Sequence, residues 1–113
     1  MAVEKNLITG SMTLLLLGLL SEKEMYGYEM IETLRERSNQ VFELKAGTLY
    51  PLLHGMEEKG FLTSYEKEVG GKVRKYYAIT GEGRKEFKKK QKAWEEYAGA
   101  VSHVIGGAVY GSI

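Results

Sequence analysis

The sequence predicts an α+β fold that is mostly α-helical, with a single β-hairpin and a long helix near the C-terminal end. Three observations lead to this prediction. The largely apolar run 12–20 is typical of a helix that is buried on nearly all sides. Two strand-like runs flank the pair Gly70-Gly71, which is a strong hairpin signal. Apolar residues then recur at helical spacing from Phe87 to Ile105.

Length and composition limit the protein to one small domain with one core. The chain has 113 residues, of which 43% are hydrophobic and 27% charged, as in ordinary globular proteins. It contains no Cys, no Asp and only two His, which argues against disulfide scaffolds, thiol nucleophiles and most metal sites. We therefore expect no metal, no cofactor and no enzymatic activity.

The apolar run 12–20 is too short for a membrane span, which needs about 20 residues. It matches the core of a signal peptide in length, but its flanks lack the charge pattern and the cleavage site. We expect a buried helix in a cytoplasmic protein that does not contact a membrane.

Two helices are predicted in the first 40 residues. The first spans about residues 9–20 and should be central, because apolar side chains surround it. The second spans about residues 27–38. Two buried stripes are compatible with it, namely Tyr28 with Ile31 and Leu34, or Met30 with Leu34.

A third helix is predicted between residues 45 and 59. Its apolar stripe consists of Leu49, Leu52, Leu53 and Met56. Proline is harmless only in a first turn, so Pro51 favours a start near Thr48, whereas a start at Ala46 implies a local bend. Gly60 is a typical C-terminal stop for this helix.

The hairpin strands are predicted at 62–69 and 72–80, and Thr80 is a candidate N-cap for a last helix from residue 82 to about 105. The apolar stripe of this helix is longer than a small domain needs to bury. A partner helix from a second copy would cover the excess, and packing on its own domain is the alternative. The predicted dimer interface consists of Phe87, Trp94, Tyr97, Ala98, Val101 and Ile105.

Three helices, a hairpin and a long helix follow the order of a winged helix-turn-helix with an added dimerisation helix. We assign residues 1–80 to the DNA-binding winged helix-turn-helix domain and residues 81–113 to the dimerisation helix with a frayed tail. Residues 72–92 carry a net charge of +7, although the whole chain carries only +1. This concentration of charge favours a polyanionic partner, and the alternative is a solvated helix face.

In this fold the third helix enters the major groove and the hairpin reaches the phosphates. The third helix, on the face opposite its Leu stripe, and the hairpin both carry side chains that hydrogen-bond bases or phosphates. The predicted DNA contacts are Lys45, Thr48, Tyr50, His54, Lys72, Arg74 and Lys75. Tyr50 packing on the second helix, and a hairpin cation pairing with Glu66 or Glu68, are the alternatives.

Several segments closely resemble the PadR family of bacterial transcriptional regulators. They are Tyr26-Gly-Tyr-Glu, Gly47-Thr-Leu-Tyr-Pro-Leu-Leu, Met56-Glu-Glu-Lys-Gly-Phe-Leu, Gly70-Gly-Lys-Val-Arg-Lys-Tyr-Tyr-Ala-Ile-Thr and Gly81-Glu-Gly. Each piece alone is weak, but the ordered combination is specific and covers about residues 14–97. The single C-terminal helix looks like the smaller PadR-like subfamily.

The resemblance implies a homodimer that binds an inverted-repeat operator in double-stranded DNA, usually as a repressor. It implies that the third helix reads the DNA, that the hairpin is the wing and that the last helix builds the dimer. It also places Ala46 and Gly47 inside the third helix and marks Thr48 and Tyr50 as DNA contacts. Some small members bind planar aromatic drugs between paired Trp side chains at the dimer centre. Trp94 falls at the matching place, which implies a small aromatic effector.

Two rival functions also fit the residues. A winged helix can be a protein-interaction module, and the net charge of −4 over residues 1–71 gives this reading some weight. The chain could also form a ligand-binding dimer without specific DNA binding, with Trp94 as the ligand platform. A salt-dependent shift of DNA in a gel, and quenching of Trp94 fluorescence by planar aromatics, distinguish these functions.

Overall fold

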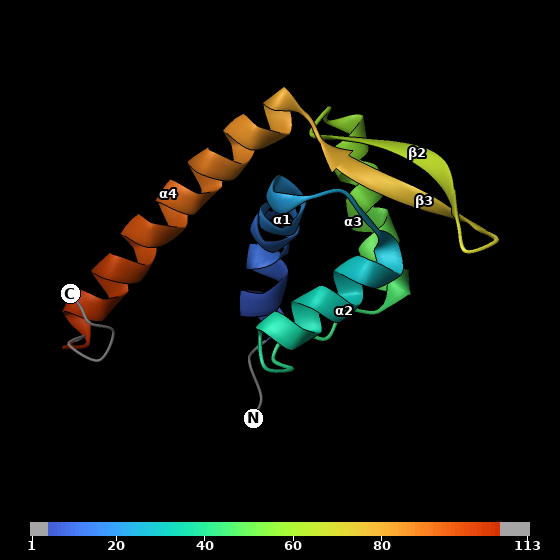
Figure 1. Ribbon diagram of the computed structural model, residues 1–113. Coiled ribbons are helices and arrows are strands. Elements are labelled where there is room, and N and C mark those ends of the chain that lie inside the picture. Colours follow the sequence, from blue (N-terminus) through green and yellow to red (C-terminus); the bar gives the residue numbers. More distant parts are fainter. Residues whose placement is uncertain (1–4, 107–113) are drawn as a thin grey trace.

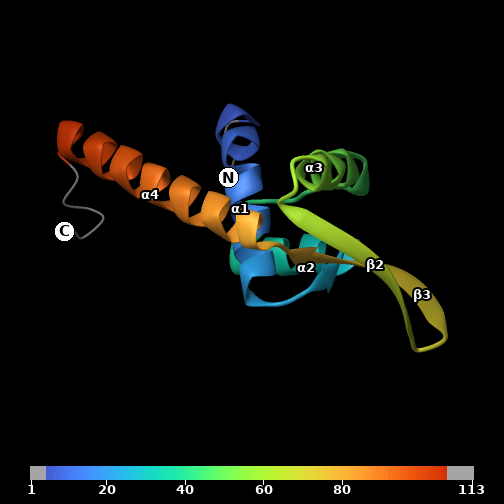
Figure 2. The same cartoon turned by 90° about the horizontal axis from the view of Figure 1, so that it is seen from above.

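The computed structural model describes residues 5–106, in which four helices and a three-stranded antiparallel sheet follow one another (Figure 1). The elements are α1 (Lys5–Glu22), β1 (Met25–Tyr26), α2 (Gly27–Arg37), α3 (Ala46–Glu58), β2 (Leu62–Val69), β3 (Lys72–Ile79) and α4 (Gly81–Val104). The molecule measures 53 × 31 × 21 Å, because α4 and the hairpin project from the helical body in opposite directions (Figure 2). The predicted α+β winged helix-turn-helix with a long C-terminal helix is confirmed.

Helix α1 forms the centre of the core, as its composition predicts. Leu16 and Leu17 have no exposed surface. Side chains from α2, α3, the sheet and the loop before α3 surround them, namely Met25, Met30, Leu34, Leu44, Leu49, Leu53, Met56, Leu62 and Tyr77. Each fully buried aliphatic side chain contributes about 1.5–3 kcal/mol. This core therefore fixes where α3 and the hairpin lie.

The predicted limits of α1 were too narrow. The helix begins at Lys5 and not near Thr9, since no Gly or Pro interrupts residues 5–9. It continues to Glu22, and the hydroxyl of Ser21 donates a hydrogen bond of 2.7 Å to the carbonyl of Gly18 in its last turns. Within residues 5–106, no helix combines the length and the apolar character that a membrane crossing requires.

Helix α2 buries the stripe formed by Met30 and Leu34, whereas Tyr28 is 60% exposed. Of the two predicted stripes, the one that contains Met30 is therefore correct. The helix ends in a Schellman motif, in which the N–H of Gln40 donates to the carbonyl of Arg35 at 2.8 Å. Asn39 and Gln40 both have positive φ angles there, 52° and 68°.

Helix α3 begins at Ala46, so the start near Thr48 that propensity favours is wrong. The amides of Thr48 and Leu49 both donate to the carbonyl of Lys45 at 2.9 Å, which closes a turn ahead of Pro51. Proline inside a helix costs about 3 kcal/mol. Burial of Leu49, Leu53 and Met56 offsets more than this cost, since each contributes about 1.5–3 kcal/mol.

The end of α3 follows the prediction. Gly60 has a φ of 81°, and its N–H donates to the carbonyl of Glu57 at 2.9 Å. The N–H of Phe61 donates to the carbonyl of Met56 at 2.9 Å, which completes a Schellman motif. The Phe61 side chain packs against the core and leads directly into β2.

The hairpin forms as predicted around Gly70 and Gly71, whose φ angles of 60° and 81° fit a type I′ turn. Val69 lies opposite Lys72, and the strands remain in register to the pair Leu62 and Ile79. The second strand ends at Ile79 and not at the predicted Thr80. The pairing with β1 was not predicted, because two residues are too few to show a period.

Thr80 caps α4, as expected, with its side-chain oxygen accepting the N–H of Gly83 at 3.0 Å. Early in α4, Gly83 and Phe87 pack against the body. A Cβ on residue 83 would lie 2.2 Å from the carbonyl oxygen of Phe61, and Phe87 lies against Gly18. The predicted frayed tail lies outside the described residues, except for Gly106 at its start.

We predict that Gln40→Gly raises the free energy of unfolding by about 0.5–1 kcal/mol, because glycine adopts a positive φ without steric cost. Chemical denaturation at fixed protein concentration measures the change. Gln40→Ala is the control, since it removes the same side chain but keeps the Cβ. Equal stability of the Gly and Ala variants would show that backbone strain at this position is not significant.

Candidate functional site

The solvent-facing side of α3 carries the four DNA contacts predicted on this helix. Lys45, Thr48, Tyr50 and His54 are all exposed, while Leu49 and Leu53 on the other side have no exposed surface. Lys45 is the N-cap residue, and no side chain caps the first turn of α3. The outer face of α3 therefore presents an ammonium group, two hydroxyls and an imidazole to solvent, next to the positive end of the helix dipole.

Tyr50 both packs on α2 and remains accessible. Its ring lies over Gly27, the first residue of α2, so close that a Cβ on residue 27 would fall 2.2 Å from the Tyr50 hydroxyl oxygen. The side chain is nevertheless 41% exposed. The two uses that the sequence left open for Tyr50 are thus compatible in this geometry.

The three predicted hairpin cations lie on β3. Lys72 and Lys75 are exposed, and the Arg74 guanidinium stacks over the ring of Tyr26 at 4.4 Å from the ring centroid. None of the ion pairs between described residues includes these three cations. Glu66 lies opposite Lys75 in the register without forming such a pair, so these three cations of the wing make no close ion pair with a described carboxylate.

A cluster of tyrosine rings beside Arg74 was not predicted as a unit. Tyr76 meets Tyr26 edge to face at 5.4 Å and stacks on Tyr65 at 5.9 Å. Lys67, which sequence reasoning missed, holds its ammonium 5.3 Å above the ring of Tyr76. Its place on β2 opposite Arg74 is the signal that could have identified it.

Two tyrosine hydroxyls at the sheet have shifted acidities. The Tyr65 hydroxyl donates a hydrogen bond to the carboxylate of Glu24, which raises the pKa of Tyr65. Burial raises the pKa of Tyr77 beneath Lys75. Both phenols therefore stay neutral at physiological pH and act as structural groups under the wing.

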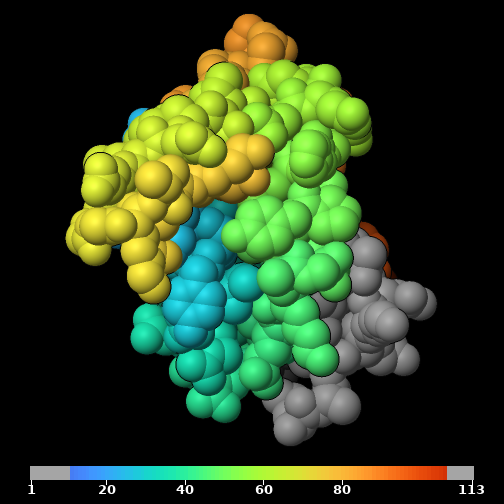
Figure 3. All heavy atoms as spheres, turned by 90° about the vertical axis from the view of Figure 1, so that its right-hand side faces the viewer, coloured from blue at the N-terminus to red at the C-terminus, as the bar shows by residue number. Residues whose placement is uncertain are grey.

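The hairpin, the beginning of α2 and α3 are exposed side by side on one face of the molecule (Figure 3). All seven predicted DNA contacts belong to two of these elements or to the residue that caps α3. The fold therefore brings together two segments that lie far apart in the sequence. Within the described residues, no group of three or more His or acidic side chains could hold a metal ion.

The predicted dimer interface divides into two parts. Phe87 packs against the core of its own chain, where a Cβ on Gly18 would lie 3.3 Å from its ring. Trp94, Tyr97, Val101 and Ile105 are 50%, 60%, 39% and 68% exposed, and Ala98 is half-buried. Val104, at 85% exposure, extends this surface beyond the predicted residues. The projecting half of α4 thus holds an apolar stripe that its own domain does not cover.

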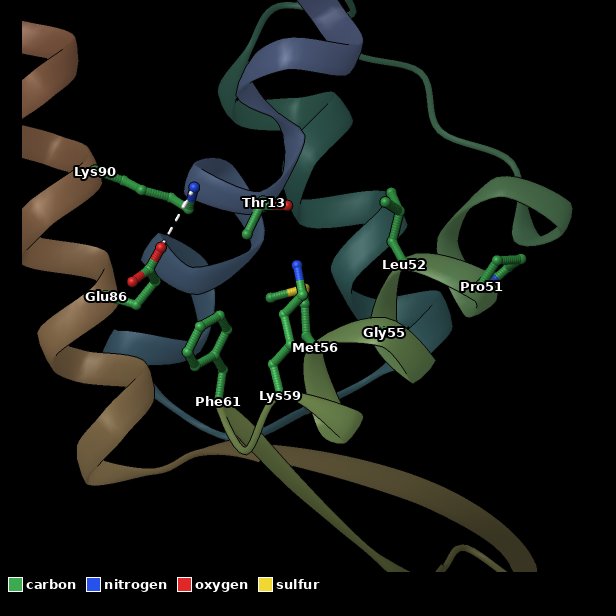
Figure 4. Close-up of a pocket in the computed structure, with 9 residues that line it drawn as sticks. All are labelled: Thr13, Pro51, Leu52, Gly55, Met56, Lys59, Phe61, Glu86 and Lys90. Carbon is green, nitrogen blue, oxygen red and sulfur yellow. Dashed lines mark ion pairs between the residues drawn. The ribbon is translucent and has the colours of Figure 1, made fainter.

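A cleft of about 220 Å³ lies between α1, α3 and α4 (Figure 4). It is lined by Thr13, Pro51, Leu52, Gly55, Met56, Lys59, Phe61, Glu86 and Lys90. Lys90 forms an ion pair of 3.4 Å with Glu86 at its edge. Trp94 does not line this cleft, and its side chain on α4 is 50% exposed.

Comparisons with known proteins agree with this architecture. The Transcriptional regulator PadR-like family matches residues 16–89. A transcriptional regulator of Mycobacterium tuberculosis is 33% identical over 90 residues, which cover 76% of this chain and 81% of the relative. The structure of a transcriptional regulator from Clostridium thermocellum superposes with a TM-score of 0.82 and 32% identity, covering 88% of this chain and 95% of that chain.

One similar structure was determined with nucleic acid. Bacillus subtilis PadR in complex with operator DNA superposes with a TM-score of 0.65 and 28% identity, covering 71% of this chain and 45% of that chain. The chain described here therefore shares the fold of a protein that binds operator DNA.

We predict that Lys72→Ala weakens binding to every DNA sequence and lowers the slope of log K against log salt by about 0.9, because one phosphate contact is lost. Titrations of one labelled duplex at several salt concentrations give the slope. Lys88→Ala is the matched control, since it removes an equally exposed charge from α4. A slope that changes equally, or not at all, in both variants would remove the wing from the DNA interface.

Proposed function

The chain belongs to the PadR-like family of transcriptional regulators, which bind DNA and are not enzymes, and we propose that it acts as a homodimeric repressor on an inverted-repeat operator. One observation carries the proposal. The polar outer face of α3 and the unpaired cations of the wing lie on the same face of the molecule. Transcription factors of this fold use these two elements for base contacts and for phosphate contacts, respectively.

In the proposed complex, α3 lies in the major groove. Thr48, Tyr50 and His54 hydrogen-bond base edges, and Lys45 contacts a phosphate or a guanine near the helix start. Lys72, Arg74 and Lys75 follow the adjacent phosphates and release counterions on binding. Base contacts thus set the preferred sequence, while the wing supplies affinity for DNA of any sequence.

The proposed dimer forms through the apolar stripe of α4. Trp94, Tyr97, Ala98, Val101, Val104 and Ile105 pair with the same stripe of a second copy, as in a twofold symmetric interface. This pairing removes large apolar side chains from water, which a single chain leaves exposed. Two copies of α3 then read two half-sites about 34 Å apart.

Trp94 and its symmetry mate give the dimer a place for a small aromatic effector. Indole rings bind planar aromatic molecules by stacking, and the Tyr97 ring lies 6.1 Å from the Trp94 ring in the same chain. A molecule between the two α4 helices would change the separation of the two reading helices and release the operator. Because it acts on DNA, we place the protein in the cytoplasm.

We predict that selection of bound duplexes from a random pool recovers an inverted repeat. The repeat should be inverted because the proposed dimer is twofold symmetric. Its half-sites should lie one helical turn apart, since the two α3 helices then enter successive major grooves on the same side of the duplex. Thr48→Ala should lower the preference for this operator over random DNA by about 1–3 kcal/mol, since one base contact is lost. Recovery of no common sequence would favour a protein-interaction module, and an unchanged preference in the variant would contradict the reading role of α3.

We predict that Trp94→Ala shifts the equilibrium from dimer to monomer, because it removes the largest aromatic side chain from the proposed interface. Sedimentation equilibrium over a range of protein concentrations measures the dissociation constant. Tyr28→Ala serves as the control, since Tyr28 is a similarly exposed aromatic residue outside α4. A dimer as tight as the wild type would place the interface elsewhere.

A further inference from the structure

We propose that the consecutive residues Tyr26 and Gly27 are positioning residues, which fix the reading helix through Tyr50 and the wing through Arg74. The proposal rests on the DNA-binding function proposed above and assigns to it two residues outside α3 and the hairpin. Tyr26 ends β1, and Gly27 begins α2. The junction of these two elements therefore touches both parts of the DNA-binding face.

Gly27 acts on Tyr50 by leaving space for its ring. A Cβ at residue 27 would lie 2.2 Å from the Tyr50 hydroxyl oxygen and 2.7 Å from the ring carbon that bears it. Side chains do not approach so closely, so a Cβ at position 27 requires the Tyr50 ring to move from this position. Gly27 is buried, and the Tyr50 ring that covers it is still 41% exposed. Glycine at position 27 thus leaves open the place that the Tyr50 ring occupies beside the first residue of α2.

Glycine at position 27 is not explained by backbone conformation. The glycines of the described residues with positive φ are Gly60, Gly70, Gly71 and Gly106, and Gly27 is not among them. Alanine is also the better helix former. The contact with Tyr50 is therefore the reason that the structure offers for glycine at this position.

Tyr26 acts on the wing through its ring and its backbone. The backbone pairs with β3, with Tyr26 opposite Tyr76. The Arg74 guanidinium lies 4.4 Å from the centroid of the Tyr26 ring, a distance typical of a cation–π contact. The tip of the hairpin extends away from the core, and Val73 near it is 66% exposed. The Tyr26 ring is therefore the support that orients Arg74 on this projecting strand.

The two contacts come from adjacent residues, so the position of the junction between β1 and α2 determines both the position of Tyr50 on the reading helix and that of Arg74 on the wing. A displacement of this junction changes the distance between the base-contacting and phosphate-contacting side chains. A DNA duplex has fixed spacing between its groove floor and its backbone. Holding both elements at the junction thus prearranges the face for binding and reduces the ordering that binding requires.

A double-mutant cycle tests the Gly27 contact. We expect Gly27→Ala to weaken binding of the selected operator roughly tenfold while binding of random DNA changes little, because it displaces a base-contacting ring. In a Tyr50→Ala background, Gly27→Ala should have no further effect, since the ring it displaces is absent. Gly55→Ala is the control, because a Cβ there meets nothing within 4 Å.

A second cycle tests the Tyr26 contact. Tyr26→Leu should weaken binding of operator and random DNA by the same factor, because the displaced Arg74 contacts phosphate and not bases. In an Arg74→Ala background, Tyr26→Leu should have no further effect.

The outcomes separate this proposal from the function on which it rests. If Tyr50→Ala weakens operator binding and Gly27→Ala does not, the positioning role is wrong and the function stands. Additive effects within either cycle also overturn the positioning role. If Tyr50→Ala binds the operator like the wild type, both fail. If Gly27→Ala does not fold, the double variant with Tyr50→Ala should fold, because it removes the clash, and failure to fold would contradict the proposal.

Discussion

Burial of α1 is the constraint on which the rest of the structure depends. The apolar side chains of this helix are spread around it and not confined to one face. Therefore α2, α3 and the sheet all pack against it. Helix α3 contains Gly47, Pro51 and Gly55, which makes it a poor helix by propensity. It is stable because Leu49, Leu53 and Met56 are buried in this core. Packing and not intrinsic helicity therefore determines the position of α3.

The features that the sequence predicted well are those that local rules determine. The hairpin followed from Gly70 and Gly71, whose positive φ angles few other residues adopt, and Thr80 and Gly60 marked helix ends by their hydrogen bonds. These are local rules, and they held. Propensity alone missed the start of α3, although the family resemblance correctly placed Ala46 and Gly47 inside this helix, and the short strand β1 was not predicted. Tertiary contacts and not local preferences determine both features.

The site was predictable in its residue types but not in its contacts. Exposure of Lys45, Thr48 and His54 follows from helical spacing relative to buried leucines. Two contacts of the site join residues more than 20 positions apart, so no local pattern indicates them. They are the packing of Tyr50 against Gly27 and the stacking of Arg74 on Tyr26. Likewise, the position of Phe87 within the stripe of α4 fitted a dimer interface, while its contact with Gly18 places it in the core.

The projecting half of α4 departs from the usual distribution of apolar and polar side chains between core and surface. Helix α4 changes character along its length: Gly83 and Phe87 pack against the body, and from Trp94 onward large apolar side chains face water. An isolated chain gains nothing from this arrangement, since exposed aromatic and aliphatic surface opposes solubility. In the proposed dimer, the same helix of a second copy buries this surface and sets the distance between the two α3 helices. The feature that is least favourable for a monomer is thus the one on which the proposed match to a twofold symmetric DNA site depends.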